Sequence, residues 1–90
     1  MFNLKYSSQF KKDLKNYKNE QKVSAELEKV LDILIKGDVL PNKYHNHSLK
    51  GSFKDCLECH IKPDIILIYK KEKSELKVLL LRVGSHSNIF

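Results

Sequence analysis

The sequence predicts a single α+β domain whose elements follow the order βααβββ. Residues 65–69 form an unbroken apolar, β-branched run, which is typical of a central strand buried on both faces. Residues 10–17 and 23–34 carry apolar side chains at helical spacing, with charged residues between them. We therefore expect two N-terminal helices, an antiparallel pair packed on one face of a largely antiparallel four-stranded sheet.

The composition is that of one soluble domain covering residues 1–90. Hydrophobic residues make up 41% and charged residues 31%, and 17 Lys and Arg against 11 Asp and Glu give a net charge of +6. A basic domain of this size often meets a polyanion or an acidic protein, although scattered lysines also simply keep a surface soluble. No run approaches the ~18 apolar residues of a membrane span, and no export signal is visible. We expect a cytoplasmic protein without membrane contact.

The boundaries of the N-terminal elements follow from local signals. Residues 2–6 alternate between apolar and polar, as in a short first strand. Ser7 or Ser8 can cap the first helix, and Gly37 can end the second helix in a left-handed conformation. The basic loop that follows, through residue 51, carries imidazole groups on exposed backbone, where function is often located.

The sequence of the C-terminal half predicts three strands joined by tight turns. The chain is expected to be extended from Ser52 to Ile61, to turn at Pro63-Asp64, and to return as the central strand. In the first of these strands Glu58 and His60 fall on one side. Residues 70–75 form a charged turn, residues 76–83 the last strand, and residues 84–90 a short tail.

Cys56 and Cys59 form a C-x-x-C motif, which zinc and redox sites use. Residues three apart on a strand face opposite sides, so both sulfurs cannot hold one metal without a kink. There is no second cysteine pair and no βαβ context for a redox site. We interpret the motif as accidental and the two cysteines as free thiols in a reducing compartment.

The histidines suggest chemistry because all four lie outside the helical stripes, at His45, His47, His60 and His86. RNA cleavage without a metal needs a base for the ribose 2′-OH, a cation for the pentavalent phosphate and an acid for the 5′-oxygen. Histidine serves in both proton roles near neutral pH. Taken singly, each histidine is better explained as a surface or structural residue, and the combination is what indicates function.

Three strings carry a family resemblance: residues 47–51 (HSLKG), residues 58–69 (ECHIKPDIILIY) and residues 81–90 (LRVGSHSNIF). Together they closely resemble the YafQ-type toxins of the RelE/ParE toxin–antitoxin superfamily, over essentially the whole chain. The resemblance implies a RelE-like βααβββ fold. It also implies a metal-independent endoribonuclease without a cofactor, an mRNA interferase that in the family's namesake acts on the translating ribosome.

The resemblance assigns the proton-transfer residues by position. The histidine of the H-x-L-x-G string corresponds to His47, and the histidine and aspartate of the H-x-x-P-D string correspond to His60 and Asp64. The G-[ST]-H histidine corresponds to His86. Glu58 matches a position that is also acidic in the family and enters as a weaker catalytic candidate.

The resemblance further assigns substrate contacts to Arg82, Lys50 and Phe90, with the arginine placed to hold a phosphate. One departure concerns Ile65, because the family has a tryptophan directly after the P-D pair. Base stacking is therefore not expected at this position.

The partners implied by the resemblance are a cognate acidic antitoxin and mRNA, with operator DNA bound only through the antitoxin complex. Two alternatives belong to other classes. A ParE-like toxin would inhibit DNA gyrase without cutting RNA, and the histidine set argues against it. A metal site built from the four histidines would need metal–nitrogen distances of about 2.0–2.1 Å, and cleavage that survives a chelator would exclude it.

Overall fold

A single sheet organises the computed structural model, which describes residues 1–90. The strand order is β1-β5-β4-β3-β2, with β1 parallel to β5 and all other neighbours antiparallel. The strands are β1 (Asn3–Tyr6), β2 (His47–Ser48), β3 (Leu57–Lys62), β4 (Ile65–Glu72) and β5 (Lys77–Gly84). The α+β class and the order of the predicted elements are confirmed, while the sheet has five strands and not four.

The central strand is β4, as the apolar run predicted. Every residue of the 65–69 segment is buried, and β4 lies between β3 and β5. Leu67 and Tyr69 face the larger of two apolar clusters, whereas Ile66 and Ile68 belong to a smaller cluster on the other face. Alternating side chains of one strand therefore contribute to two separate layers.

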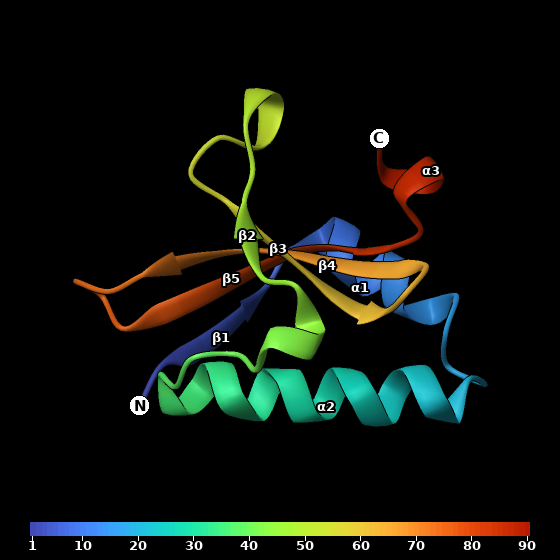
Figure 1. Cartoon of the computed structure of the whole chain (residues 1–90), viewed down its shortest axis with the longest axis horizontal. Coiled ribbons are helices and arrows are strands. Elements are labelled where there is room, and N and C mark those ends of the chain that lie inside the picture. The colour runs from blue at the N-terminus through green and yellow to red at the C-terminus, as the bar shows by residue number, and fades with distance from the viewer.

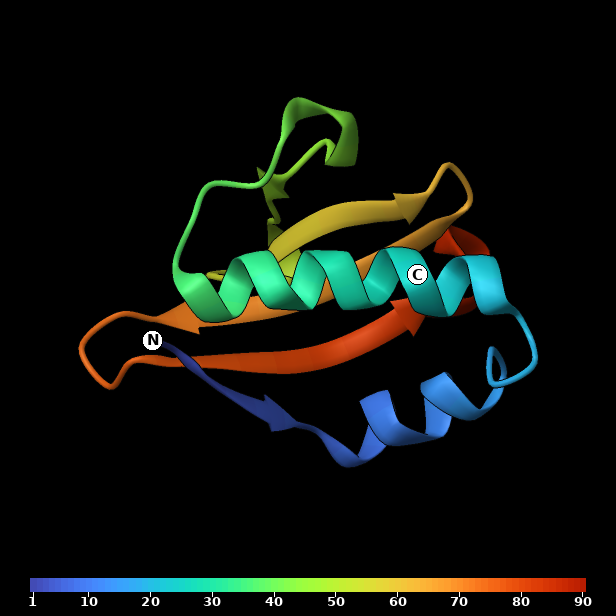
Figure 2. The same cartoon turned by 90° about the horizontal axis from the view of Figure 1, so that it is seen from below.

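The two long helices, α1 (Ser8–Lys15) and α2 (Gln21–Lys36), pack on one face of the sheet. The Ser7 hydroxyl accepts the hydrogen bond of the Phe10 amide and caps α1, and Gly37 ends α2 at φ 75°. Figure 2 shows α2 in front of the sheet, running roughly along its strands, and α1 lying toward the β1 edge. Phe10 of α1 and Leu34 of α2 belong to the same core cluster. Each helix packs chiefly against the sheet, α1 against β5 and α2 against β3.

The opposite face is covered by short elements that the sequence pattern did not predict. A 3₁₀ turn, η2 (Gly51–Phe53), occupies the segment expected to be extended from Ser52, and the tail contains a four-residue helix, α3 (His86–Ile89). Phe53 and Ile89 pack against the smaller cluster of Cys56, Ile66 and Ile68. In Figure 1 these elements project from the side of the sheet opposite α2.

The additional strand, β2, consists of a single pair of ladder positions. His47 lies opposite Glu58, and Ser48 lies opposite Leu57. Such a segment is too short to produce a period-2 pattern, which explains why it was expected to be loop. It nevertheless fixes one histidine beside β3.

The two cysteines lie in different clusters, Cys56 on the α3 side and Cys59 on the α2 side, as strand alternation predicts. Both are free thiols, and burial raises the pKa of Cys59 to about 12. This thiol therefore stays protonated at neutral pH. Separately, none of the helices combines the length and hydropathy needed to cross a membrane.

Candidate active site

The candidate site is centred on the carboxylate of Glu58, whose side chain is 2% exposed. Strand pairing places Glu58 between His47 on β2 and Ile68 on β4, on the face opposite α2. Burying a carboxylate is costly unless partners compensate for the lost water. The side chains around Glu58 therefore decide what this position can do.

Three imidazoles surround one oxygen of this carboxylate. The distances from Glu58 Oε2 to the Nε2 atoms are 3.1 Å for His47, 3.4 Å for His86 and 3.7 Å for His60. The three rings come from β2, α3 and β3, and their side chains are 51%, 61% and 27% exposed. A buried anion thus stands behind three solvent-accessible proton carriers, and we call these four residues the Glu58–histidine cluster.

The orientation of His47 is set by His45. The backbone at His45 takes a left-handed conformation with φ 47°, and its carbonyl oxygen lies 2.8 Å from His47 Nδ1. Nδ1 therefore carries a proton, because a carbonyl oxygen only accepts. A neutral His47 ring would then turn the lone pair of Nε2 toward Glu58. His47 Nε2 lies 3.1 Å from Glu58 Oε2, which is ion-pair distance when the ring is protonated.

His86 is the first residue of α3, which Ser85 caps through a hydrogen bond from the Asn88 amide. The Phe90 ring lies 5.1 Å from the His86 ring and 5.4 Å from the Phe53 ring. This aromatic row joins the end of the chain to η2. Phe90 thus lies beside the Glu58–histidine cluster, where the sequence predicted a substrate contact.

Arg82 lies at the end of β5 and is paired with Asp13 of α1. Its Nε donates to Asp13 Oδ2 at 2.8 Å and one terminal nitrogen donates to Oδ1 at 3.4 Å, while the Val83 amide donates to Oδ2 at 3.1 Å. Burial raises the pKa of Asp13, but the bonds from Arg82, Gln9 and Val83 outweigh this effect and hold it below the ordinary 3.8. Arg82, which the sequence predicted to bind a phosphate, is thus held in place by the buried carboxylate of Asp13.

Two predicted site residues lie outside the Glu58–histidine cluster. Asp64 is exposed in the β3–β4 turn, and no hydrogen bond or ion pair joins it to His60. Lys50 is exposed beside η2 and has no ion pair. Ile65, the residue directly after the P-D pair, is 7% exposed and belongs to the core.

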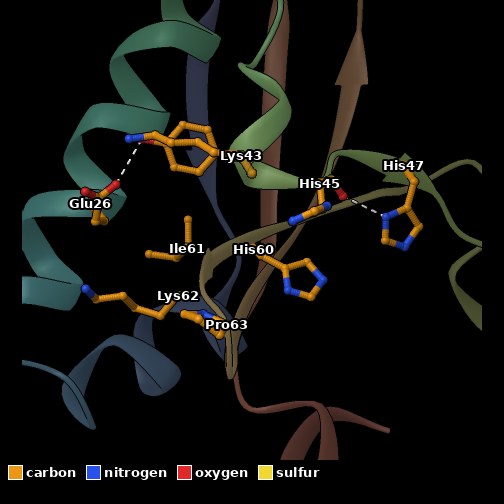
Figure 3. A pocket seen from close by; sticks show the side chains of 9 residues that line it. Glu26, Lys43, His45, His47, His60, Ile61, Lys62 and Pro63 are labelled. Atoms are coloured by element: carbon orange, nitrogen blue, oxygen red, sulfur yellow. Dashed lines mark hydrogen bonds between the residues drawn. The ribbon is translucent and has the colours of Figure 1, made fainter.

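An open cavity of about 670 Å³ borders the cluster. Figure 3 shows His45, His47 and His60 on one side of it and Glu26 of α2 on the other. Lys62 and Pro63 complete the wall next to β3.

Metal ligation requires several donors that converge on one point. No group of three or more His, Cys, Asp or Glu side chains is arranged to hold a metal ion. In the Glu58–histidine cluster the Nε2 atoms of the three imidazoles lie 3.1–3.7 Å from one carboxylate oxygen.

Sequence reasoning missed the parts of the site that act through the backbone or over long separations. Asp13 lies 69 positions before Arg82 and was not among the predicted site residues. The orienting role of the His45 carbonyl has no side-chain signature. A burial pattern was the one available signal, since Asp13 lies next to the apolar stripe of α1.

Comparison with known proteins identifies the family of the chain. The family model for YafQ, a bacterial toxin of type II toxin–antitoxin systems, matches residues 2–90. The mRNA interferase toxin YafQ of Escherichia coli K12 is 35% identical over 88 residues, which cover 97% of this chain and 94% of that protein.

Solved structures show the same similarity in three dimensions. A metal-bound toxin from Helicobacter pylori is 43% identical with a TM-score of 0.89, and covers 100% of both chains. The E. coli DinJ–YafQ complex gives a TM-score of 0.87 at 33% identity, covering 100% of this chain and 99% of that one. The chain therefore belongs to the YafQ family of type II toxin–antitoxin toxins.

Proposed function

We propose that this chain, the toxin of a type II toxin–antitoxin system and an mRNA interferase like its E. coli relatives, cleaves RNA by metal-independent acid–base catalysis in the Glu58–histidine cluster. One observation carries the proposal: three partly exposed imidazoles lie within 3.1–3.7 Å of one buried carboxylate oxygen. The arrangement supplies several proton carriers and an anion that stabilises their charged forms.

The reaction transfers two protons. One imidazole removes the proton of the ribose 2′-OH, and the 2′-oxygen attacks the adjacent phosphorus. A protonated imidazole donates its proton to the departing 5′-oxygen as the P–O5′ bond breaks. The products are a 2′,3′-cyclic phosphate and a 5′-hydroxyl. His47, His60 and His86 are the candidates for these two roles. Glu58 stabilises the imidazolium that the base becomes and the imidazolium from which the acid donates its proton.

The remaining predicted residues are proposed to bind substrate. Arg82 keeps one terminal nitrogen without an intramolecular partner, and this nitrogen is available to a phosphate. Lys50 adds an unpaired charge, and Phe90 offers an exposed ring beside His86. Asp64 lies on the adjacent turn and would need a substrate-dependent movement to act on His60.

The partners follow from the family. The DinJ–YafQ complex supports a cognate antitoxin, which we expect to be acidic because this chain carries a net charge of +6. We further propose that the substrate is mRNA on the ribosome, in the cytoplasm. Operator DNA is expected to bind only through the antitoxin complex.

The test is to incubate the purified protein with RNA and a chelator, and to analyse the new ends. Cyclic or 3′-phosphate and 5′-hydroxyl ends are expected. Ends with a 5′-phosphate, or activity lost to the chelator and restored by zinc, would overturn the metal-free mechanism. The Helicobacter relative is a metal-bound structure, so other divalent metal ions are included in the restoration series. Intact RNA together with inhibited gyrase would favour the ParE-like alternative.

A single variant tests whether His86 takes part in proton transfer. His86→Ala should lower the cleavage rate about 10²–10⁴-fold, the usual loss of a general acid or base, with little change in melting temperature because the side chain is 61% exposed. A fully active variant would assign the two proton transfers to His47 and His60.

A further inference from the structure

We propose that the cavity between α2 and β3 binds the nucleobase next to the scissile phosphate, and that Glu26 selects a base with an amino group over uracil. The inference rests on the proposed function, since it names a subsite of the same active centre. Its residues are distinct from the catalytic candidates, apart from the two histidines that the cavity and the cluster share.

The location of the cavity supports this assignment. His47 and His60 line it and also contact Glu58, so a group bound there lies directly beside the reacting phosphate. Its volume of about 670 Å³ falls within the range of roughly 300–1,000 Å³ that is common for small-molecule sites. A nucleotide unit is a ligand of that size.

The charges of the cavity distinguish a base from a phosphate. Lys43 and Lys62 lie on its walls and suit the backbone of a bound RNA. Glu26 is the acidic residue of the same lining and repels any phosphate placed against it. A carboxylate inside an RNA-binding cavity is compatible with a base edge that presents N–H donors.

Glu26 is held in position as an acceptor. The Tyr44 hydroxyl donates to Glu26 Oε2 at 2.9 Å, and the Tyr44 side chain is anchored by burial, with 3% exposure. This hydrogen bond, with the nearby charges of Lys29 and Lys43, lowers the pKa of Glu26, which stays ionised at neutral pH. Oε1 has only a 3.4 Å contact with the exposed Lys29 ammonium and is therefore open to a ligand.

The chemistry of the bases gives the preference. Adenine, cytosine and guanine each present an exocyclic amino group to an acceptor, whereas the single N3–H of uracil lies between two carbonyl oxygens that a carboxylate repels. His45 lies at the rim, with its ring 5.6 Å from the His60 ring at an interplanar angle of 71°. Its exposed imidazole gives the bound base an aromatic surface on which to stack.

The test compares the wild-type protein with Glu26→Gln on RNAs that differ only in the base next to the cleaved bond. Glutamine keeps the size and the acceptor for Tyr44, but adds an amide donor that uracil can accept. The preference for an amino-bearing base over uracil should fall about tenfold, the ratio that one charge-assisted hydrogen bond supports. Asp32→Asn is the matched control, because Asp32 is a 63% exposed carboxylate on the same helix, paired with Lys36 outside the cavity.

A binding measurement separates this inference from the proposed function. Titration with AMP should shift the amide signals of residues 43–45 and 60–62, more weakly in Glu26→Gln, and UMP should shift them less than AMP. If the wild-type protein cleaves no RNA, the proposed function fails, and the titration still decides on the subsite. Unchanged base preference or unchanged AMP affinity in Glu26→Gln would overturn the inference.

Discussion

Glu58 illustrates how a single buried charge organises the site. Its Oε2 is shared by three imidazoles, while Oε1 has no hydrogen-bond partner and is shielded from solvent. A charge held this way is expensive for folding, because burial removes its water and one of its oxygens has no partner. The presence of a carboxylate here, despite this cost, points to a functional role of Glu58.

Glu58→Gln therefore separates stability from activity. The variant should melt at the same or a higher temperature than the wild type, because the amide needs less compensation for burial. Its cleavage rate should fall at least about 10²-fold, since the imidazolium forms lose their counter-charge. Thermal unfolding and single-turnover cleavage measure the two effects, with the exposed Glu28→Gln as control. Full activity in Glu58→Gln would contradict the assigned role.

Asp13 differs from Glu58, because replacing Asp13 should lower the stability of the fold. The carboxylate accepts bonds from Arg82, Gln9 and the Val83 amide, and Asp13→Ala leaves these donors unpaired. We expect a loss of roughly 2–3 kcal/mol in the free energy of unfolding at neutral pH.

The pH dependence of that loss has a definite sign. The pKa of Asp13 is lowered on folding, so its contribution is complete above the ordinary value of 3.8 and disappears as the pH falls through the lowered value. Urea unfolding should show the difference between wild type and Asp13→Asn shrinking below pH 3.8. A difference that grows in acid would contradict this.

Residue-level prediction from sequence succeeded where periodicity applied. Alternation along β3 placed Glu58 and His60 on one face, and the structure confirms it. The pairing of Asp13 with Arg82 depends on how α1 meets the end of β5, which no local pattern encodes. The approach of His47 to Glu58 depends on the register of a two-residue strand.

Among the elements, length decided what could be predicted. β4 and α2 are eight and sixteen residues long, and their burial patterns were readable from apolar spacing. β2 has two residues and α3 has four, fewer than one repeat of a reliable pattern. These two short elements bring His47 and His86 to the Glu58–histidine cluster, so the family resemblance, and not periodicity, identified them.

Loss of the Phe90 ring, next to α3, should affect RNA cleavage more than it affects the stability of the fold. Phe90 is 57% exposed and touches the rings of Phe53 and His86. Phe90→Ala should change stability by less than about 1 kcal/mol, as is usual for exposed positions, and should reduce cleavage because His86 loses a neighbour that restricts it. The exposed Val39→Ala is the control for both measurements. A cleavage rate equal to that of the control would assign Phe90 no part in the reaction.

For the whole molecule, net charge governs the approach of partners. The chain carries +6 within a radius of gyration of 12.2 Å, and the lysines of α1 at positions 11, 12 and 15 are exposed without ion pairs. The Debye length is about 30 Å at 0.01 M salt and about 3 Å at 1 M. The field of the protein therefore reaches well beyond its surface at low salt and is confined to it at high salt.

We predict that an acidic antitoxin associates with this toxin at a rate that falls at least about tenfold between those two salt concentrations, while the dissociation rate changes much less. The reason is that steering acts before contact, whereas the formed interface excludes the screening ions. Stopped-flow fluorescence with the purified cognate antitoxin measures both rates. Replacing Lys11, Lys12 and Lys15 with glutamine should flatten the salt dependence of association. If association were equally fast at both salt concentrations, the basic surface would have no part in antitoxin capture, and burial of apolar surface alone would have to explain the complex.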